Sequence, residues 1–453
     1  MKGICEIQNW PGSSELVVTL PGDWGPHLAS NRQDQVTLRA GNRKAAAHVV
    51  YTDEAEVQMT QALRSELCLP LGKISVKAVN GELRFGPFVG LYALPAKTPG
   101  KPFGELTALF QDMMPLAEQA GVSVFVFVPG EINWGDGIVS CYVYKPREKH
   151  WVRTKRPLPD LVMPKIMGQP PQWRDLIRRD LLQIAKQVPY GNFSNATGHK
   201  WEVHLTLEQN EATRRFLPET ILVRTPRDVD DLLERHRIVY LKPSYGTQGK
   251  RIYRLSLPGQ GQGVRIQYMQ NGRTLHRRLQ RPGSTWQRFL QQRFCAGRAY
   301  LAQQGIDLLA DRGVRPVDFR WLMQKDGANV WHVTARIARV GGSGSITTNL
   351  HTGGRAVLAD DLLQSNGFAD AAVRSKLLDS LDEAAHSICR VLEAKAGRIG
   401  ELGIDFGVTA EGRIYLIEVN PRPGRQMLKQ TSPGVRALSL LRNLEYAKYT
   451  TGF

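Results

Sequence analysis

The sequence has few cysteines and no long apolar run. Its five cysteines are scattered over 453 residues without a Cys-x-x-Cys pair, which argues against a disulfide framework and a structural zinc site. The longest apolar run, Val122–Val128, is interrupted by Ser123 and is far shorter than the roughly 20 residues of a membrane-spanning helix. The first residues also lack the apolar segment of an export signal. We therefore expect a protein of the reducing cytoplasm with no membrane span.

Acidic residues are missing between Arg235 and Ile306. This stretch contains fourteen lysines and arginines, in a chain whose net charge is +18. A solvated surface normally mixes both signs, so a one-signed block predicts a nearby anion, such as phosphates, an acidic substrate or a polyanion. Nucleic acid is a weaker explanation, because the basic residues are not interleaved with a recognisable nucleic-acid-binding motif.

Length and composition predict two or three domains with full-sized cores. Residues 1–82 show short alternating segments separated by turn residues, which predicts a β-rich N-terminal domain. In residues 83–166, an apolar strand at Phe88–Leu94, a helical pattern at Gly104–Ala120 and the apolar run after it predict a β-α-β unit and hence a parallel sheet. No Gly-x-Gly-x-x-Gly follows the first of these strands, so no dinucleotide site is predicted. Residues 167–453 are assigned to a further domain.

The segment Gly403–Gly424 has the pattern of a β-hairpin, with a tight Glu-Gly turn between two apolar-rich runs. With those two residues as the loop, Asp405 lies opposite Glu418, and Asn420 shares their face. Two carboxylates that close repel each other unless a cation lies between them, and hard oxygen donors suit Mg²⁺. The alternative is a solvated strand with two acids, but Glu418 lies in an apolar run, where an unpaired acid is costly. Asp405, Glu418 and Asn420 are therefore predicted metal ligands.

A second candidate element is the stretch Lys242-Pro-Ser-Tyr-Gly-Thr-Gln-Gly-Lys250, between two predicted strands. Small residues let backbone N–H groups approach an anion, and a lysine at a strand end can reach phosphate oxygens. The stretch is not a Walker A loop, because no helix follows it. By itself the pattern is weak, since an ordinary Gly-rich turn explains it. In the same chain as the predicted metal ligands, it indicates phosphate binding.

A third element is a predicted hairpin with Asp326-Gly327 as its loop. In that register Asp318, Arg320 and Arg339 fall on one sheet face, where two arginines could clamp a phosphoryl or carboxyl group. A surface Asp–Arg pair explains the same residues equally well. The Gly- and Thr-rich segment Gly341–Gly354 that follows is typical of a loop that wraps a ligand.

Together, these motifs resemble the ATP-grasp superfamily, most closely the endospore coat-associated YheC/YheD-like family, from about Pro87 to the C-terminus. The resemblance implies a mixed α+β and α/β chain whose ATP-grasp domain grips ATP between two α+β subdomains. The mobile lid would be at about residues 217–305. Residues 83–166 would form a small β-α-β pre-ATP-grasp domain, preceded by the β-rich N-terminal domain.

The order of motifs in the family implies roles for particular residues. His199-Lys200-Trp201 is similar to the family's first lysine motif, and Lys242 with the Gly-rich loop is similar to its second lysine and phosphate-covering loop. Tyr300–Ile306 looks like the hinge strand that grips adenine, with a glutamine where many relatives carry a ribose-binding Glu. The nucleotide-binding residues implied in this way are Lys200, Lys242, Ser244, Gly246, Thr247, Gln248, Gly249, Gln303, Gln304 and Ile306.

Asp318-Phe-Arg320, Arg339 and Asn349-Leu-His-x-Gly-Gly354 also resemble the ribosomal-protein glutamate ligase RimK. This resemblance implies that Arg320, Arg339 and Asn349 are catalytic residues, with the arginines steadying an acyl-phosphate. It also implies that the predicted metal ligands hold Mg²⁺ against the phosphates of ATP.

The implied function is an ATP- and Mg²⁺-dependent ligase that joins a carboxylate to an amine or a thiol. An acidic acceptor would account for the basic block, with Arg277, Arg278 and Arg281 as docking residues. Spore coat proteins are implied as partners, and association with the spore is implied beside the cytoplasm. Two alternatives stay open: a phosphotransferase with a hydroxyl acceptor, and a coat scaffold without catalytic activity. The intact metal trio and both lysines weigh against the scaffold.

Overall fold

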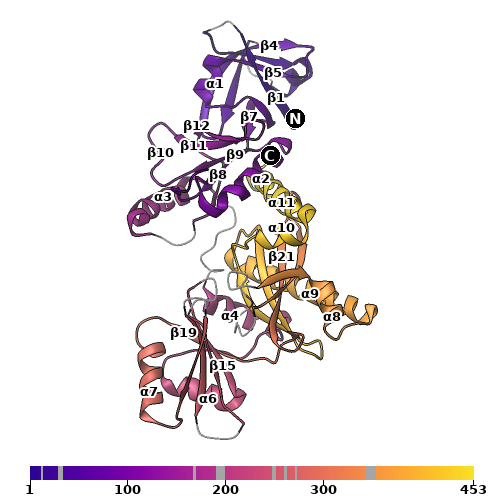
Figure 1. Ribbon diagram of the computed structural model, residues 1–453. Helices are drawn as coiled ribbons and strands as arrows, with labels where there is room; N and C mark the ends of the chain where they lie inside the picture. Colours follow the sequence, from indigo (N-terminus) through magenta and orange to yellow (C-terminus); the bar gives the residue numbers. More distant parts are fainter. Residues whose placement is uncertain are drawn as a thin grey trace. The chain divides into compact units, whose positions relative to one another are not determined.

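The computed structural model describes residues 1–11, 14–28, 34–166, 170–189, 199–246, 251–259, 263–270, 273–342, 348 and 354–453, with only the backbone at 429 and 430. The chain forms two compact units, each assembled from separated segments (Figure 1). The first comprises Met1–Asn192, Lys325–Val330 and Ala437–Phe453, and the second comprises Phe193–Gln324 and Trp331–Arg436.

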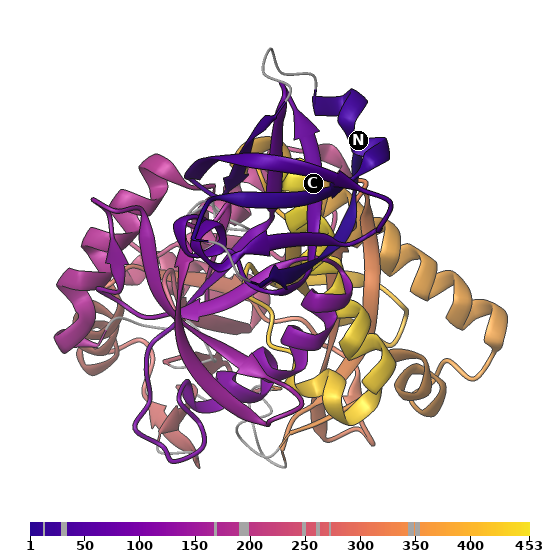
Figure 2. The same ribbon diagram turned by 90° about the horizontal axis from the view of Figure 1, so that it is seen from above.

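The N-terminal part of the first unit is a closed β-barrel, drawn in indigo in Figure 2. Its elements are β1 (Lys2–Trp10), β2 (Val17–Pro21), a 3₁₀ helix (Gly22–Leu28), β3 (Gln35–Ala40), β4 (Arg43–Thr52), β5 (Val57–Thr60), α1 (Gln61–Leu67), β6 (Gly72–Val79) and β7 (Glu82–Gly86). The strand order is β1-β5-β2-β4-β3-β7-β6. Alternate residues point inward, as in β3, where Val36, Leu38 and Ala40 are buried.

A second sheet completes the first unit, with strand order β10-β11-β9-β8-β13 and β12 paired to β11. Its elements are β8 (Phe88–Tyr92), a 3₁₀ helix (Gly104–Leu106), α2 (Thr107–Gln119), β9 (Ser123–Phe127), β10 (Ile132–Asn133), β11 (Ile138–Lys145), β12 (His150–Pro157), β13 (Leu161–Pro164), a 3₁₀ helix (Pro171–Trp173) and α3 (Arg174–Gln187). Strands β8 and β9 pair in parallel across α2, so the predicted β-α-β unit is confirmed.

The last helix of the chain, α11 (Pro433–Thr451), supplies part of the core around this second sheet. Leu440, Leu444 and Ala447 are buried in one cluster with residues of α2, β8 and β9. Beyond the helix, the buried ring of Phe453 lies 4.6 Å from Lys77 Nζ, so the C-terminal segment contacts the barrel as well.

The second unit begins with α4 and α5 and contains a six-stranded sheet of order β14-β19-β15-β16-β17-β18. We call this sheet, with the two helices that follow β14 and β18, the lid subdomain; Val203 and Leu207 of α4 are instead buried in the core of the rest of the unit. The elements are α4 (Lys200–Glu208), α5 (Glu211–Arg214), β14 (Thr220–Leu222), α6 (Pro226–His236), β15 (Ile238–Pro243), β16 (Tyr253–Ser256), β17 (Val264–Gln270), β18 (Arg273–Leu279), α7 (Ser284–Leu290), a π-helical turn (Gln291–Cys295) and β19 (Tyr300–Gln304). In Figure 1, α6 and α7 lie beside β15 and β19.

The rest of the second unit is built on a sheet of order β23-β22-β21-β24-β25, with β20 paired to β21. Its elements are β20 (Ala310–Asp311), β21 (Arg315–Lys325), β22 (Trp331–Val340), β23 (Arg355–Leu358), α8 (Ala359–Ser365), α9 (Ala371–Ala396), β24 (Glu401–Val408), β25 (Ile414–Asn420) and α10 (Gln426–Thr431). We call it the C-terminal subdomain.

Helix α9 covers one face of the C-terminal sheet. Asp370 caps its first turn by accepting hydrogen bonds from the N–H groups of Ala372 and Val373, and buried residues recur every three or four positions along it. Its apolar stripe shares a core with Trp321 and Phe406 of the sheet. The opposite face of β24 therefore carries the polar residues of the candidate site. The predicted domain boundaries after residues 82 and 166 stay predictions.

Candidate active site

The hairpin β24–β25 pairs Asp405 with Glu418 and Gly403 with Asn420, so Asp405, Glu418 and Asn420 lie on one sheet face. Its turn differs from the predicted one. Val408 pairs with Ile414, and Thr409 N donates to Arg413 O at 3.0 Å. The loop is therefore longer than Glu411-Gly412. An irregularity between Asp405 and Phe406 restores the predicted register, because one extra residue of β25 bulges there.

The chemistry of this trio fits Mg²⁺, which prefers hard oxygen donors and keeps several waters. The described residues contain no group of three His, Cys, Asp or Glu side chains able to hold a metal, and the predicted trio includes an asparagine. Asn420 Nδ2 donates to Asp405 Oδ2 at 3.2 Å, a contact that does not use its carbonyl oxygen. Glu418 is about one-third exposed. The metal assignment stays a prediction.

Asp405 is held in a buried network of charges. Arg320 lies directly opposite it on β21, and its guanidinium contacts both carboxylate oxygens, at 2.8 Å for Oδ2. Arg339 donates to Asp405 Oδ2 at 2.8 Å and to Asp318 Oδ1 at 2.6 Å. Burial alone would raise the pKa of Asp405, but Arg320 and Arg339 outweigh burial and hold that pKa below its usual range. Asp405 could therefore bind a metal ion only by giving up part of these contacts.

The predicted clamp residues Arg320 and Arg339 are less than one-tenth exposed. Burial lowers the pKa of Arg339, and Asp318 and Asp405 more than compensate, so the net shift is upward. The arginines and acids do share one cluster, as predicted, but the guanidinium groups are engaged with carboxylates. The loop between β21 and β22 was predicted to contain two residues, Asp326 and Gly327. It spans more, because Asp326 N donates to Val330 O and Asn329 has a positive φ of 64°.

Lys200 and Lys242 interact with the acids of this face from two different elements. Lys200, in the first turn of α4, forms an ion pair with Glu418 and donates to Gly246 O at 3.2 Å. Lys242, near the end of β15, donates to Gln303 Oε1 at 2.5 Å. Burial lowers the pKa of Lys242 to about 8, while Glu418 acts in the opposite direction and Lys200 adds to the decrease. The two lysines, Asp405, Glu418 and Asp318 thus form one electrostatic cluster.

The predicted phosphate loop is described only at its start. Ser244 is buried, its N donates to Ala299 O at 3.0 Å, and its O accepts from Lys200 N at 3.2 Å. Gly246 contributes the carbonyl that Lys200 contacts. Thr247, Gln248, Gly249 and the predicted catalytic residue Asn349 lie outside the described residues.

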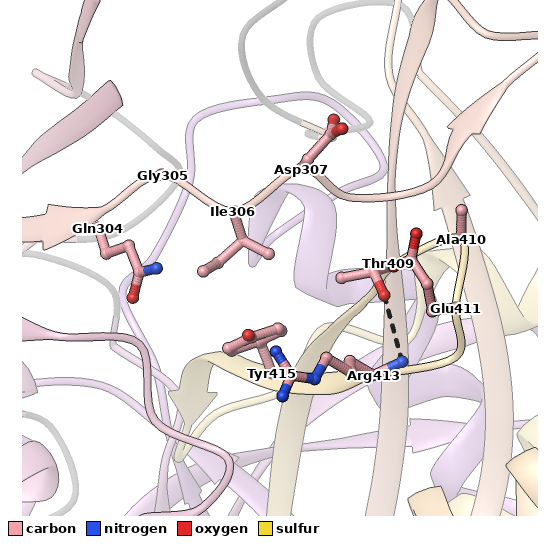
Figure 3. Close-up of a pocket in the computed structure, with 9 residues that line it drawn as sticks. All are labelled: Gln304, Gly305, Ile306, Asp307, Thr409, Ala410, Glu411, Arg413 and Tyr415. Carbon is pink, nitrogen blue, oxygen red and sulfur yellow. Dashed lines mark hydrogen bonds between the residues drawn. The ribbon is translucent and has the colours of Figure 1, made fainter. Parts of the chain in front are cut away.

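The predicted hinge residues line a cavity beside the hairpin turn (Figure 3). The cavity has a volume of about 280 Å³ and is lined by Gln304, Gly305, Ile306, Asp307, Thr409, Ala410, Glu411, Arg413 and Tyr415. Figure 3 shows Gln304 and Ile306 facing Tyr415 across it. Gln304 Oε1 also accepts from Glu219 N at 3.2 Å. The role of Gln304 toward a ribose stays a prediction.

Sequence reasoning missed the wall of this cavity that the hairpin supplies. Thr409, Arg413 and Tyr415 line this wall, and the loop between Thr409 and Arg413 is one residue longer than predicted. Asp307 was also missed, although an acid directly after the predicted hinge strand could have been recognised as a candidate ligand-binding residue. Gln303 does not line the cavity. It lies on the same sheet face as Lys242 and also donates to Thr220 Oγ1 at 3.0 Å.

Comparison with known proteins identifies the family. The model of the YheC/D-like ATP-grasp family matches residues 190–450, more than half of the chain. The chain belongs to the YheC/D-like ATP-grasp family. The ATP-grasp fold and the family expected from the sequence are therefore confirmed. ATP-grasp ligases in general use ATP and Mg²⁺.

Two curated relatives come from Bacillus subtilis (strain 168). Endospore coat-associated protein YheD is 29% identical over 428 residues, which are 93% of this chain and 92% of the relative. Endospore coat-associated protein YheC is 24% identical over 320 residues, 70% of this chain and 85% of the relative. Among solved structures, the ATP-grasp ligase PsnB complexed with a minimal precursor, Mg and ADP is 12% identical. It has a TM-score of 0.45 and covers 79% of this chain and 97% of that chain. Among the described residues, none of the helices has the length and apolar character needed to cross a membrane.

Proposed function

We propose that this YheC/D-like protein is an ATP- and Mg²⁺-dependent ligase that joins a carboxylate to an amine or a thiol. The observation that carries the proposal is the convergence of Lys200 and Lys242 on the sheet face of Asp405 and Glu418. Two cations from separate elements, facing oxygen ligands for a hard metal ion, suit the phosphates of a nucleotide. The adjacent cavity, with Ile306 and Tyr415 in its walls, is suited to an aromatic base.

The reaction would proceed in two steps. A substrate carboxylate oxygen attacks the γ-phosphorus of ATP, the bond to the β-phosphate oxygen breaks, and ADP leaves with that electron pair. The acceptor amine or thiol then attacks the acyl-phosphate carbonyl and expels phosphate, after its proton has passed to a base. Mg²⁺ would be held by Glu418 and Asn420, with Asp405 beside them, and would offset charge on the phosphoryl oxygens.

The chain's own residues have separable roles in this scheme. Lys200 and Lys242 would bind phosphate oxygens, and nucleotide binding would replace the ion pair between Lys200 and Glu418. Arg320 and Arg339 would act chiefly through Asp405, which they keep ionised and fixed. This differs from the sequence-based hypothesis that both guanidinium groups contact the acyl-phosphate.

The names of the two curated relatives support a role at the spore coat or envelope, with coat proteins as partners and a cytoplasmic or spore-associated location. The phosphotransferase stays the alternative, because the same site could transfer the γ-phosphoryl group to a hydroxyl.

The deciding experiment measures ADP and free phosphate separately, with pooled carboxylates, amines and thiols added singly and in pairs. Free phosphate that appears only when a carboxylate and an amine or thiol are both present supports the ligase. ADP without free phosphate, with a phosphorylated acceptor detected by mass spectrometry, indicates the phosphotransferase. ADP release that is unchanged in Glu418→Gln would overturn the assignment of the site.

A further inference from the structure

The lid sheet has two chemically different faces. Val239, Leu241, Leu255, Val264 and Ile266 point to one side, where they share a buried core with Trp286, Leu290 and Phe294 of the α7 region. Because side chains alternate along strands, the residues between them point to the other side. We call this other side the open face.

Backbone pairing places two polar rows on the open face. One row runs across neighbouring strands through Tyr240, Arg254, Gln267 and His276, and the next runs through Ser256, Arg265 and Arg278. Lys242 lies on the same face, two residues after Tyr240, with its Nζ 6.0 Å from that ring. Exposure increases toward the edge strand, since Arg254 is half-buried whereas Arg265, His276 and Arg278 are exposed. The open face therefore starts at the proposed phosphate site and continues outward as a basic strip.

This strip has no acidic residue to balance it along its own strands, because Arg235–Ile306 contains neither Asp nor Glu. Arg265 and Arg278 are direct cross-strand partners, an arrangement of like charges that destabilises a sheet. Charged side chains on an edge strand also prevent sheet-to-sheet aggregation. That purpose accounts for β18, but not for Arg254 and Arg265 on the inner strands β16 and β17.

The three arginines that the sequence grouped as docking residues separate in the structure. Arg281 Nε lies 2.7 Å from Asp230, and its NH2 group lies 2.7 Å from Glu234, so its charge is used to hold α6. Arg277 is on the helix side of β18, and its guanidinium lies 5.7 Å from the ring of Phe289. Of the three, Arg278 belongs to the open face.

The basic strip consists of Arg254, Arg265 and Arg278, one from each of three neighbouring strands. We propose that this strip of the open face docks an acidic, carboxylate-rich polypeptide segment beside the nucleotide site. The proposal rests on the proposed function, since an acceptor or carboxylate substrate of the ligase must reach that site. Guanidinium groups pair with carboxylates through two parallel hydrogen bonds, and the charge of the strip is complementary to such a segment.

A nucleic acid fits the open face less well. Proteins that bind single strands combine basic residues with aromatic rings on which bases stack. Tyr253 and Tyr268 are directly paired on the helix side of the sheet, and Tyr240 is half-buried. On the exposed part of the strip, the aromatic ring is that of His276.

The test measures binding of dye-labelled poly-L-glutamate by fluorescence anisotropy at low ionic strength, without nucleotide. The double variant Arg265→Gln/Arg278→Gln is expected to bind about tenfold more weakly than the wild-type chain, since two charge contacts are lost. The matched control, Arg277→Gln, removes the same charge from the other face of β18 and is expected to change affinity by less than about twofold. Arg265→Lys/Arg278→Lys keeps both charges and is expected to retain most of the binding.

Each contrary outcome has a definite meaning. An equal loss in Arg277→Gln, or no binding of poly-L-glutamate to the wild-type chain, overturns the docking strip. Tighter binding of a single-stranded oligonucleotide of equal charge, lost in the same double variant, assigns the strip to nucleic acid instead. Thermal melting checks that the variants fold, and if the double variant does not, Arg265→Gln and Arg278→Gln are compared singly with Arg277→Gln. Mg-ADP binding is measured in parallel, so that failure of the nucleotide site, and with it the proposed function, is seen separately from failure of the strip.

Discussion

Lys200 and Glu418, 218 residues apart in the sequence, form an ion pair between the first turn of α4 and strand β25. Their side chains are 22% and 32% exposed. A partly exposed pair contributes little to stability, about 1 kcal/mol or less. The pair is therefore better explained by function: Lys200 would bind a nucleotide phosphate and Glu418 a metal ion. A role in stability and a role in function predict different effects of mutation.

Replacing Glu418 should separate function from folding. Glu418→Ala is expected to abolish Mg²⁺-dependent ATP turnover, because it removes a proposed metal ligand, and to change the free energy of unfolding by about 1 kcal/mol or less. Turnover is measured by ADP release and stability by urea denaturation. A variant that turns over ATP normally with Mg²⁺ would show that the metal assignment is wrong.

Both lysines are expected to contribute to nucleotide affinity. Lys200→Met or Lys242→Met should weaken ATP binding by about 2 kcal/mol, the order expected for loss of a charge-assisted contact. Isothermal titration calorimetry measures this, with the exposed Lys376 of α9 changed to Met as the control. Unchanged affinity in both site variants would contradict the proposed phosphate contacts.

The pKa of Lys242, lowered to about 8 chiefly by burial, predicts a pH dependence of binding. Phosphates favour the protonated lysine, so nucleotide affinity should fall as the pH rises through about 8, and binding near that pH should take up protons. Calorimetry in buffers with different ionisation enthalpies measures the uptake. Lys242→Arg, whose side chain stays charged, should lose this step; an identical pH profile in that variant would assign the step to another group.

The network around Asp405 predicts a large effect on stability. Asp405→Asn leaves Arg320 and Arg339 buried with one neutralising acid fewer, which should cost about 3–5 kcal/mol. Urea denaturation measures it, and Asp379→Asn on the exposed side of α9 is the matched control. Should Asp405→Asn unfold like the wild-type chain, the carboxylate would not be the centre of the network.

A glycine in the predicted hinge, Gly305, can be tested by adding a side chain. A Cβ at Gly305 would lie 3.0 Å from Ile238 O and closer still to the Ile238 side chain. Gly305→Ala should therefore displace the hinge and weaken nucleotide binding. Gly259→Ala, where the added Cβ meets no atom within 4 Å, should bind as the wild-type chain does. Equal affinities in the two variants would mean that the hinge tolerates the shift.

Much of the hairpin β24–β25, which carries the proposed metal ligands, could be predicted from the sequence, because alternation along a strand fixes which side chains share a face. The opposition of Asp405 and Glu418 was nevertheless obtained from a turn that is wrong. The longer loop and the bulge each shift the register by one residue, in opposite senses, and neither has a clear signature in the sequence.

Other features depend on partners distant in the sequence. Closure of the barrel requires parallel pairs such as β1–β5, which no local pattern specifies. Arg281 was predicted to dock a substrate because the block Arg235–Ile306 contains no acid. Its ion-pair partners, Asp230 and Glu234, lie just before that block. The buried ion pairs of Arg320 and Arg339 with Asp405 likewise depend on the pairing of β21, β22 and β24, which the sequence pattern does not specify.

The first unit is assembled from the beginning, the middle and the end of the chain, and this has a consequence for synthesis on the ribosome. Domains usually fold in order of emergence, the N-terminal one first. Here the core around α2 includes Leu440, Leu444 and Ala447, which are translated after the whole of the second unit. The barrel can close early, but the apolar surface beside it has to wait, solvated or protected by a chaperone, until the last helix leaves the exit tunnel.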